Sequence, residues 1–505
     1  MQHKTWKKNH KWFGLIFSFF LLSFCLSGLV LNHRQLFSTI DVSRSLLPEG
    51  YQYHTWEKGV LQGTARYQNE QGESLVLYGL NGMWLTKDKQ TDFADFNKGL
   101  RQGAENRVIK GVLQMPTQDL FAVTQFDFLR FNTTEKAWIK QPLVVEGEER
   151  FTDLTSRGDS LLILTRSHLY IGLPPYTQFK KITFKPATNE DGKVSLFRTI
   201  WLLHSGQLFG FIGQLFVDAL ALVLILLCLT GLCYWFLPKT IKRAKKAGKA
   251  TKRQVEVFKK NVYWHKKIGA ATIVLTLFLA FTGWALRPPL LIVLGMSRVP
   301  AIPGTTLCSD NSWKDHLRML RFDYEAQDWL LSSSEGMYAL TDFEAKPVPV
   351  PSAPSISVMG ITVFKQQRAD RWLIGSFSGL YKWNRQTGEV HDYFTDKPVQ
   401  KRSRMLFDQR SVSGFSEDLV PGQETVIEYN AGSDFAPMPA LIRNQPMSLF
   451  KLMLEVHTGR IYTFLGKGSF FYITFMGLAI LWTLWTGYKL VRKKKKTHKL
   501  STPQK

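Results

Sequence analysis

Four long apolar segments constrain the fold of this chain more than any other feature. Each covers about the 20 residues that an α-helix needs to cross the hydrocarbon core of a bilayer. They are residues 12–31, 209–236, 267–286 and 461–490 of the 505. The first follows basic residues, as the apolar part of a signal peptide does. Its apolar run is too long for that, and no small-x-small cleavage site follows, so a retained anchor is predicted.

The net charge of +25 is concentrated in three short segments beside these apolar runs. Residues 1–11 hold four Lys, residues 238–267 hold twelve Lys and Arg against one Glu, and residues 489–505 hold eight Lys and Arg. Basic residues in short segments beside membrane spans set orientation and do not indicate nucleic-acid binding. Both termini and the central basic segment are therefore predicted to be cytoplasmic, and the two long segments between spans to be exported.

The predicted fold class is a membrane protein with four transmembrane α-helices and β-rich exported domains. The predicted order is a cytoplasmic tail (1–11), span (12–31), exported segment (32–208), span (209–236), basic cytoplasmic loop (237–266), span (267–286), exported segment (287–460), span (461–490) and basic cytoplasmic tail (491–505).

The two halves of the chain repeat each other, which predicts a duplicated two-helix unit. The sequence NHKWFG at 9–14 matches WHKKIG at 264–269, and each opens an apolar run that closes on a Gly 18 residues after its His. A second pair, LHSGQLF at 203–209 and VHTGRIY at 456–462, precedes the other two runs. A parallel duplication of this kind relates the halves by an axis along the membrane normal.

The exported segments are predicted to be rich in β-strands. Short runs of Val, Thr, Tyr, Phe and Trp alternate with Gly, Asn and Asp turns. Four stretches share the order strand, small-residue turn and aromatic-rich strand: residues 75–86, 161–172, 329–341 and 372–383. Repeats of this spacing are typical of propeller blades contributed by both segments. Two separate small α+β domains are an alternative that the same pattern allows.

The repeated histidines suggest paired axial ligands of haem iron. A haem in a helical bundle needs two neutral imidazoles facing each other, with close backbone approach beside them. The duplication places His10 opposite His265 near the cytoplasmic face and His204 opposite His457 near the outer face. His33 lies at a similar depth and is a further candidate for the outer ligand. The competing interpretation is that these histidines are interfacial residues that cap helices or contact headgroups.

Glycines accompany each histidine pair. Gly14 and Gly269 lie four residues after the first pair on the same helix face, where a missing side chain leaves room for a porphyrin edge. Gly206 and Gly459 are predicted to serve similarly outside, although small residues also let membrane helices pack closely without a cofactor.

The predicted cofactor is two haem b groups without covalent attachment, because the chain has no C-x-x-C-H motif. No G-x-G-x-x-G motif follows a strand, so no flavin or nicotinamide domain is expected. Electrons would come from a quinol in the bilayer or from a cytoplasmic reductase.

These motifs together resemble the PepSY-associated transmembrane family of bacterial inner-membrane proteins. The matching pieces are the His-x-x-x-Gly openings, the LHSGQLFG and VHTGR runs, and the Ser-Gly or Thr-Gly pairs that close the spans (27–28, 230–231, 282–283 and 486–487). The exported segments depart from the usual PepSY pattern, and Thr463 stands where the first copy has Gly210. The resemblance implies a multi-pass protein of the inner membrane associated with iron uptake, and some members are haem-containing reductases of ferric siderophores.

Two functions follow from these observations. The leading one is transfer of electrons to a ferric siderophore or other ferric chelate in the periplasm. The alternative is a non-enzymatic sensor or assembly factor, whose exported β domain binds a protein or peptide and whose helices anchor it.

Overall fold

The computed structural model describes residues 3–70, 72–87, 91–147, 149–357, 360–399 and 410–499. It divides into two compact units. The membrane unit comprises Met1–Phe37, Gly192–Cys308 and Phe450–Lys505, and the β unit comprises Ser38–Asp191 and Ser309–Leu449. Each unit therefore takes segments from both halves of the chain.

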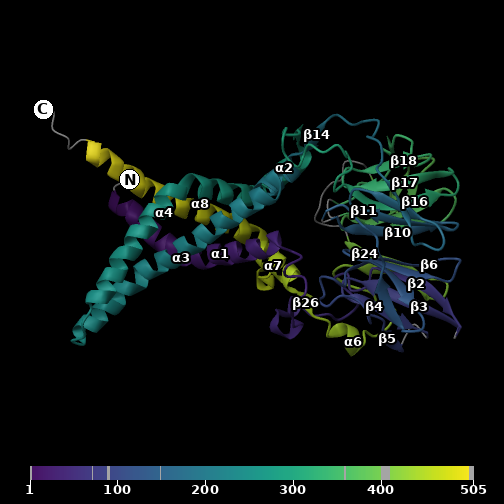
Figure 1. The fold of residues 1–505 in the computed structure, drawn as a ribbon, viewed down its shortest axis with the longest axis horizontal. Helices are drawn as coiled ribbons and strands as arrows, with labels where there is room; N and C mark the ends of the chain where they lie inside the picture. The colour runs from purple at the N-terminus through teal and green to yellow at the C-terminus, as the bar shows by residue number, and fades with distance from the viewer. Residues whose placement is uncertain are drawn as a thin grey trace. The chain divides into compact units, whose positions relative to one another are not determined.

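Four long helices form the membrane unit (Figure 1): α1 His3–Asn32, α3 Gly210–Lys246, α4 Lys252–Ala285 and α8 Ser469–Lys499. Within the described residues, these four helices are long and apolar enough to cross a membrane. Helices α1 and α4 each pack against both α3 and α8, so α1 and α4 occupy opposite corners of the bundle. The repeat unit in sequence is thus a repeat unit in space, with α1 equivalent to α4 and α3 equivalent to α8.

Short helical elements flank the long helices. They are α2 Leu196–Ser205, the 3-10 helix Gln207–Phe209, α5 Leu290–Met296, α7 Leu449–His457 and the 3-10 helix Thr463–Gly468. Strands β14 Lys193–Ser195 and β15 Arg298–Pro300 pair antiparallel. The Ser195 hydroxyl accepts a hydrogen bond from the Arg198 backbone N–H and so caps α2.

The helices differ in extent from the predicted spans. Helix α3 continues to Lys246 and α4 begins at Lys252, so most of the basic segment 237–266 is helical and not a loop. Lys, Arg, Gln and Ala are good helix formers, and the break falls at Gly248, which has φ +68°. The fourth helix begins at Ser469 and not at residue 461, because Gly466 adopts φ +49° inside the preceding turn.

Among the described residues, the β unit contains six larger antiparallel sheets and one two-stranded pair, β1 (Asp41–Val42) with β26 (Met447–Ser448) (Figure 1). Five have four strands each. Their strands are β2 Gly63–Asn69, β3 Gly72–Gly79, β4 Gly82–Thr86 and β5 Phe93–Asp95; β6 Ile109–Gln114, β7 Leu120–Thr124, β8 Phe128–Asn132 and β9 Ala137–Lys140; β10 Phe151–Arg157, β11 Ser160–Thr165, β12 Leu169–Gly172 and β13 Phe179–Ile182; β16 Leu317–Asp323, β17 Asp328–Ser333, β18 Met337–Leu340 and β19 Val348–Pro349; β20 Ile361–Gln366, β21 Arg371–Ser376, β22 Gly379–Asn384 and β23 Val390–Asp392. The sixth has β24 Val412–Val420 and β25 Gln423–Glu428 among the described residues.

The first strands of these sheets form a closed ring. Strand β2 contacts β6, β6 contacts β10, and the series continues through β16, β20 and β24 back to β2. The closure is polar at its rim, where Thr64 Oγ1 lies 2.6 Å from Ser416 Oγ and Arg66 Nε donates to Asp418 Oδ1 at 2.8 Å. The β unit is a six-bladed propeller, and three blades come from each of the two long segments between spans. Two separate α+β domains are therefore excluded.

The blades repeat in detail, which explains the strand–turn–strand pattern of the sequence. The first strand of several blades shifts register after its first residue, as between Ile109 and Gly111 and between Ile361 and Val363. The second strand often ends in Thr or Ser, whose hydroxyl accepts backbone N–H groups of the following turn, as at Thr165 and Ser333. Buried aromatic side chains pack between blades: Trp84 of the first blade belongs to the same core cluster as Leu419 and Ile427 of the sixth.

The remaining elements of the β unit are short. Strands β1 Asp41–Val42 and β26 Met447–Ser448 pair antiparallel near its ends, and α6 is Ala440–Arg443. Two 3-10 turns, Arg44–Leu46 and Glu49–Tyr51, precede the first blade.

Candidate functional site

The inner pair, His10 and His265, lies between helices α1 and α4 at the end of the bundle that carries the basic segments. The two imidazole centroids are 6.3 Å apart, and the rings are inclined by 53°. His10 Nδ1 lies 3.2 Å from Thr486 Oγ1 and 3.1 Å from the Thr483 carbonyl oxygen. His265 Nδ1 lies 2.9 Å from Thr230 Oγ1. The structure therefore brings the first predicted pair together and anchors each ring on a neighbouring helix.

The outer pair, His204 and His457, has almost the same geometry at the other end of the helices. The centroids are 6.2 Å apart and the rings are inclined by 49°. His204 Nδ1 lies 3.1 Å from Thr282 Oγ1. His457 Nδ1 lies 3.0 Å from both Ser27 Oγ and the Phe24 carbonyl oxygen. The second predicted pair is also brought together, although its histidines come from α2 and α7 and not from the long helices.

The hydroxyl groups determine which imidazole nitrogen carries the proton. Each hydroxyl donates its own proton to a carbonyl of its own helix, as in the bonds Ser27 to Ser23, Thr230 to Leu226, Thr282 to Leu279 and Thr486 to Thr483. A hydroxyl has one proton, so its oxygen must accept from the imidazole. The protonated nitrogen is therefore Nδ1 in all four rings, and the lone pair is on Nε2.

Backbone carbonyls support the same assignment. Each imidazole also bonds the carbonyl three residues before its hydroxyl partner, namely Thr483, Leu227, Leu279 and Phe24. A carbonyl oxygen can only accept a hydrogen bond. Fixing one ring nitrogen as a donor in this way is how proteins orient histidines whose other nitrogen binds a metal.

Glycine follows each supporting hydroxyl because the imidazole lies against the helix backbone there. An added Cβ would lie 2.7 Å from His204 Cε1 at Gly283 and 3.1 Å from His10 Cε1 at Gly487. The corresponding distances at Gly28 and Gly231 are 3.4 and 3.5 Å, to His457 and His265. The Ser-Gly and Thr-Gly pairs of the sequence thus form four equivalent packing surfaces, one for each imidazole.

The separation of the rings fits one metal ion between the members of each pair. A metal–imidazole nitrogen bond is about 2.0 Å, and the ring centre lies roughly 1.1 Å beyond that nitrogen, so two imidazoles on opposite sides of one ion have centroids about 6.2 Å apart. The observed separations of 6.3 and 6.2 Å match this value. Two neutral imidazoles with free Nε2 lone pairs are also the donor set of low-spin haem iron.

The structure gives His33 another partner. His33 Nε2 lies 2.7 Å from Asp218 Oδ2 on α3, and the other oxygen of this carboxylate accepts from Asn32 Nδ2 at 3.0 Å. In the described part of the chain, His33 contacts neither His204 nor His457. The nitrogen that would bind a metal is instead engaged by a carboxylate, because Asp218 is buried in an apolar helix and requires polar partners.

The four glycines of the sequence prediction have two different roles. Gly206 and Gly459 adopt φ values of +80° and +73°, which end α2 and α7 directly after the outer histidines. The lack of a side chain lets Gly206 and Gly459 adopt this left-handed conformation, which ends each helix. An added Cβ at Gly14 would meet Thr483 Cγ2 at 3.9 Å and one at Gly269 would meet Leu227 Cδ2 at 3.6 Å, both ordinary contact distances. Their role beside a porphyrin remains a prediction.

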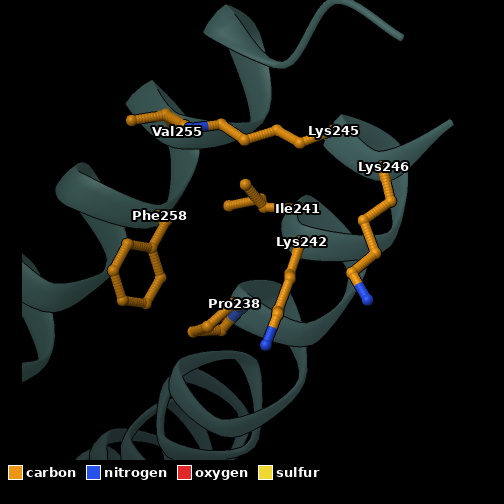
Figure 2. A pocket seen from close by; sticks show the side chains of 7 residues that line it. All are labelled: Pro238, Ile241, Lys242, Lys245, Lys246, Val255 and Phe258. Atoms are coloured by element: carbon orange, nitrogen blue, oxygen red, sulfur yellow. The ribbon is translucent and has the colours of Figure 1, made fainter. Parts of the chain in front are cut away.

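A cavity of about 490 Å³ lies between α3 and α4, close to the turn that joins them (Figure 2). Its walls are apolar side chains and lysines: Pro238, Ile241, Lys242, Lys245, Lys246, Val255 and Phe258. Phe258 precedes His265 by two turns of α4, which is roughly 10 Å along the helix axis. An anionic molecule with an apolar part suits this lining.

Sequence reasoning found all four histidines of the two pairs but not what holds them. The Ser-Gly and Thr-Gly pairs were visible as repeated span endings, yet their function depends on contact with a histidine of another helix, from 35 to 476 residues away. The signal that could have revealed it is the recurrence of a hydroxyl before each of these glycines, four times, at the opposite end of a span from a histidine.

Comparison with known proteins places the chain in a family. The family model described as PepSY-associated TM region matches residues 8–494. No curated protein matches the chain.

Solved structures of other proteins show distant similarity. The extracellular domain of the putative one component system BT4673 from B. thetaiotaomicron aligns with 9% identity and a TM-score of 0.36, covering 76% of this chain and 40% of that one. The extracellular domain of the putative hybrid two component system BT3049 from the same organism aligns with 11% identity and a TM-score of 0.32, covering 75% and 41%. This chain spans about two fifths of each of these structures.

Proposed function

Because the chain belongs to the PepSY-associated TM region family, we propose that it is a haem-containing electron-transfer protein of the bacterial inner membrane. In this proposal it reduces ferric iron, in the form of a ferric siderophore, on the periplasmic side. The inner and outer histidine pairs each hold one haem b.

One observation carries the proposal: four imidazoles have the same support and form two pairs with the same separation. A capping or headgroup-binding histidine has no need of a partner at the same depth, nor of a hydroxyl, a carbonyl and a glycine on a second helix. Repetition of this set at both ends of the bundle favours ligation of a metal at both ends.

The residues of the chain prepare each site before any cofactor binds. The Ser and Thr hydroxyls hold the proton on Nδ1, which leaves Nε2 free and fixes the plane of the ring. The glycines allow the ring to lie close to the backbone. Haem would supply one-electron redox chemistry at each pair.

The two sites together suit transfer across the bilayer. From His10 to Gly28 helix α1 rises roughly 27 Å, which is close to the thickness of the hydrocarbon core. Chelators of the siderophore type bind Fe(III) more strongly than Fe(II), so a one-electron reduction favours release of the iron. The propeller is the water-exposed part of the chain that can meet such a chelate.

The proposed electron donor is a quinol or a cytoplasmic reductase. Quinol would approach through the bilayer. A soluble donor would meet the basic segment between α3 and α4, where lysines line the cavity near Phe258 (Figure 2).

An absorption spectrum of the purified full-length protein tests the proposal. Protein from haem-supplied cells should show a sharp low-spin Soret band that shifts on reduction with dithionite, with two haems per chain. Colourless protein would overturn the proposal and would favour the second candidate, a membrane-anchored binding or sensor protein whose functional part is the propeller.

The proposed orientation is tested separately with reporter fusions. Fusions truncated after Gly103 or Pro354 should be active with a periplasmic reporter and inactive with a cytoplasmic one, because the basic residues are concentrated beside the other ends of the spans. Cytoplasmic activity at either position would contradict the orientation.

A further inference from the structure

An arginine, Arg287, lies beside the outer pair. It follows the last residue of α4, Ala285, by two positions, and its positive charge acts on both His204 and His457. Its side chain is partly buried. Among the residues that the structure describes, no carboxylate or carbonyl forms a hydrogen bond or ion pair with its guanidinium.

The nearest carboxylate is already engaged. Glu455 interacts with Arg287 at longer range, but its oxygens accept from Arg460 at 2.8 and 2.9 Å and lie 3.3 Å from Lys451 Nζ. Arg460 in turn repels Arg287. Burial and the neighbouring Arg460 lower the pKa of Arg287 to about 10, so it stays positively charged at neutral pH.

The backbone holds Arg287 firmly in this position. Its N–H donates to the Trp284 carbonyl at 3.0 Å, its carbonyl accepts from Leu291 N–H at 3.0 Å, and the next carbonyl, of Pro288, accepts from the Thr474 hydroxyl of α8 at 2.9 Å. A partly buried cation that has no hydrogen-bonded carboxylate, and whose nearby carboxylate is shared with two other cations, costs free energy; an anionic ligand offsets that cost. The site is therefore prepared for an anion.

The location identifies the anion. Arg287 follows Gly283, on which the His204 ring packs, by four residues, and lies just past the end of α4 that is distant from the inner pair. A haem carries two carboxylate groups at one edge of its ring, and guanidinium binds carboxylate through two parallel hydrogen bonds. Resting on the haem function proposed above, we propose that Arg287 binds a propionate carboxylate of the haem held by His204 and His457. Arg287 thereby fixes which edge of that haem faces outward.

The test compares Arg287→Gln and Arg287→Lys with the unaltered full-length protein. Loss of a charge-assisted hydrogen bond should speed transfer of the outer haem to an apo-myoglobin acceptor roughly tenfold or more. It should also lower the reduction potential of that haem, because an uncompensated carboxylate stabilises the ferric state. Arg287→Lys should have a transfer rate and a reduction potential between those of the unaltered protein and of Arg287→Gln, since Lys keeps the charge but cannot form two parallel hydrogen bonds. Arg298→Gln removes an exposed arginine of the same unit and should change neither quantity.

Haem dimethyl ester, whose propionates are blocked, separates a carboxylate contact from a general structural effect. The difference in affinity between unaltered protein and Arg287→Gln should disappear when haem-free protein is loaded with the ester. The inner haem is the internal control for folding, and its spectrum and potential should be the same in all variants.

The possible failures are distinguishable. Unaltered protein that carries two low-spin haems, with an Arg287→Gln variant of the same outer potential and transfer rate, overturns the role of Arg287 and leaves the proposed function intact. A persistent difference with the dimethyl ester also overturns it. Unaltered protein without a Soret band overturns both proposals.

Discussion

The inner and outer pairs present their imidazoles in the same way, but the backbone that carries them differs. His10 and His265 lie inside the long helices α1 and α4, whereas His204 and His457 end the short helices α2 and α7. The outer histidines are each followed within two residues by a glycine in the left-handed region, which turns the chain into the next helix. The hydroxyl, carbonyl and glycine that contact each imidazole are therefore the same at both pairs, whereas the helices that carry the histidines differ.

The comparison also shows how the bundle is connected. Helix α1 carries His10 of the inner pair and Ser27, whose hydroxyl bonds the outer His457; α4 likewise carries His265 and Thr282, whose hydroxyl bonds the outer His204. Helices α3 and α8 support the inner pair through Thr230 and Thr486. Each pair thus depends on both halves of the chain, and neither half can assemble a complete site alone.

Removal of one histidine should have the largest effect and should divide the four residues into two pairs. We expect His10→Ala and His265→Ala to abolish low-spin character of the same haem, and His204→Ala and His457→Ala to do so for the other, because bis-imidazole ligation needs both rings. Haem content should fall from two towards one per chain, measured by pyridine haemochrome and by electron paramagnetic resonance. Normal spectra in all four variants would show that these histidines are interfacial residues.

Substitution of the glycines that contact the imidazoles should change the spin state of the haem to an extent that depends on the position. In Gly283→Ala the new methyl would lie 2.7 Å from His204 Cε1, so the ring must move. Overpacking of this kind costs about 1–3 kcal/mol, and we expect part of the outer haem to become high-spin. In Gly231→Ala the methyl lies 3.5 Å from His265 Cε1, an ordinary contact, so the inner haem should stay low-spin. Equal effects at the two positions would contradict the structure.

Removal of a supporting hydroxyl should have a smaller effect, because the backbone carbonyl still accepts from Nδ1. We expect Thr282→Val to weaken outer haem retention and Thr230→Val to weaken inner haem retention, each by about 1 kcal/mol or roughly fivefold. Haem transfer to an acceptor protein measures this. Thr276→Val on the same helix is a matched control, since the Thr276 hydroxyl bonds only carbonyls of α4 in the described structure. A control variant as impaired as Thr282→Val would assign the effect to helix stability.

Replacement of His33 should have the smallest effect on the haems. His33 is bonded to Asp218, so His33→Ala should leave haem content and both spectra unchanged. It removes a partner of a buried carboxylate and should lower the thermal midpoint of the protein by a few degrees. Loss of the outer haem in His33→Ala, with no change in His204→Ala, would show that the outer site is built asymmetrically.

The amino-acid sequence by itself determined the four spans and the pairing of the histidines. Both depend on local composition and on internal repetition: a run of apolar residues near 20 long has few alternatives in a bilayer, and a duplication places equivalent residues at equal depth. The strand–turn–strand pattern also indicated β structure in the two long segments between spans, since alternation and turn residues act over a few positions.

Only the tertiary structure decided how the blades form a closed ring and which groups bond each imidazole. The ring of blades joins Thr64 in the first long segment between spans to Ser416 in the second, and three blades from either segment cannot close without the other three. The proton on each Nδ1 likewise depends on a hydroxyl and a carbonyl of a distant helix, such as Thr486 and Thr483 for His10. Hydrogen-bond partners that are hundreds of residues apart leave no local pattern, because their only common property is their position in the folded protein.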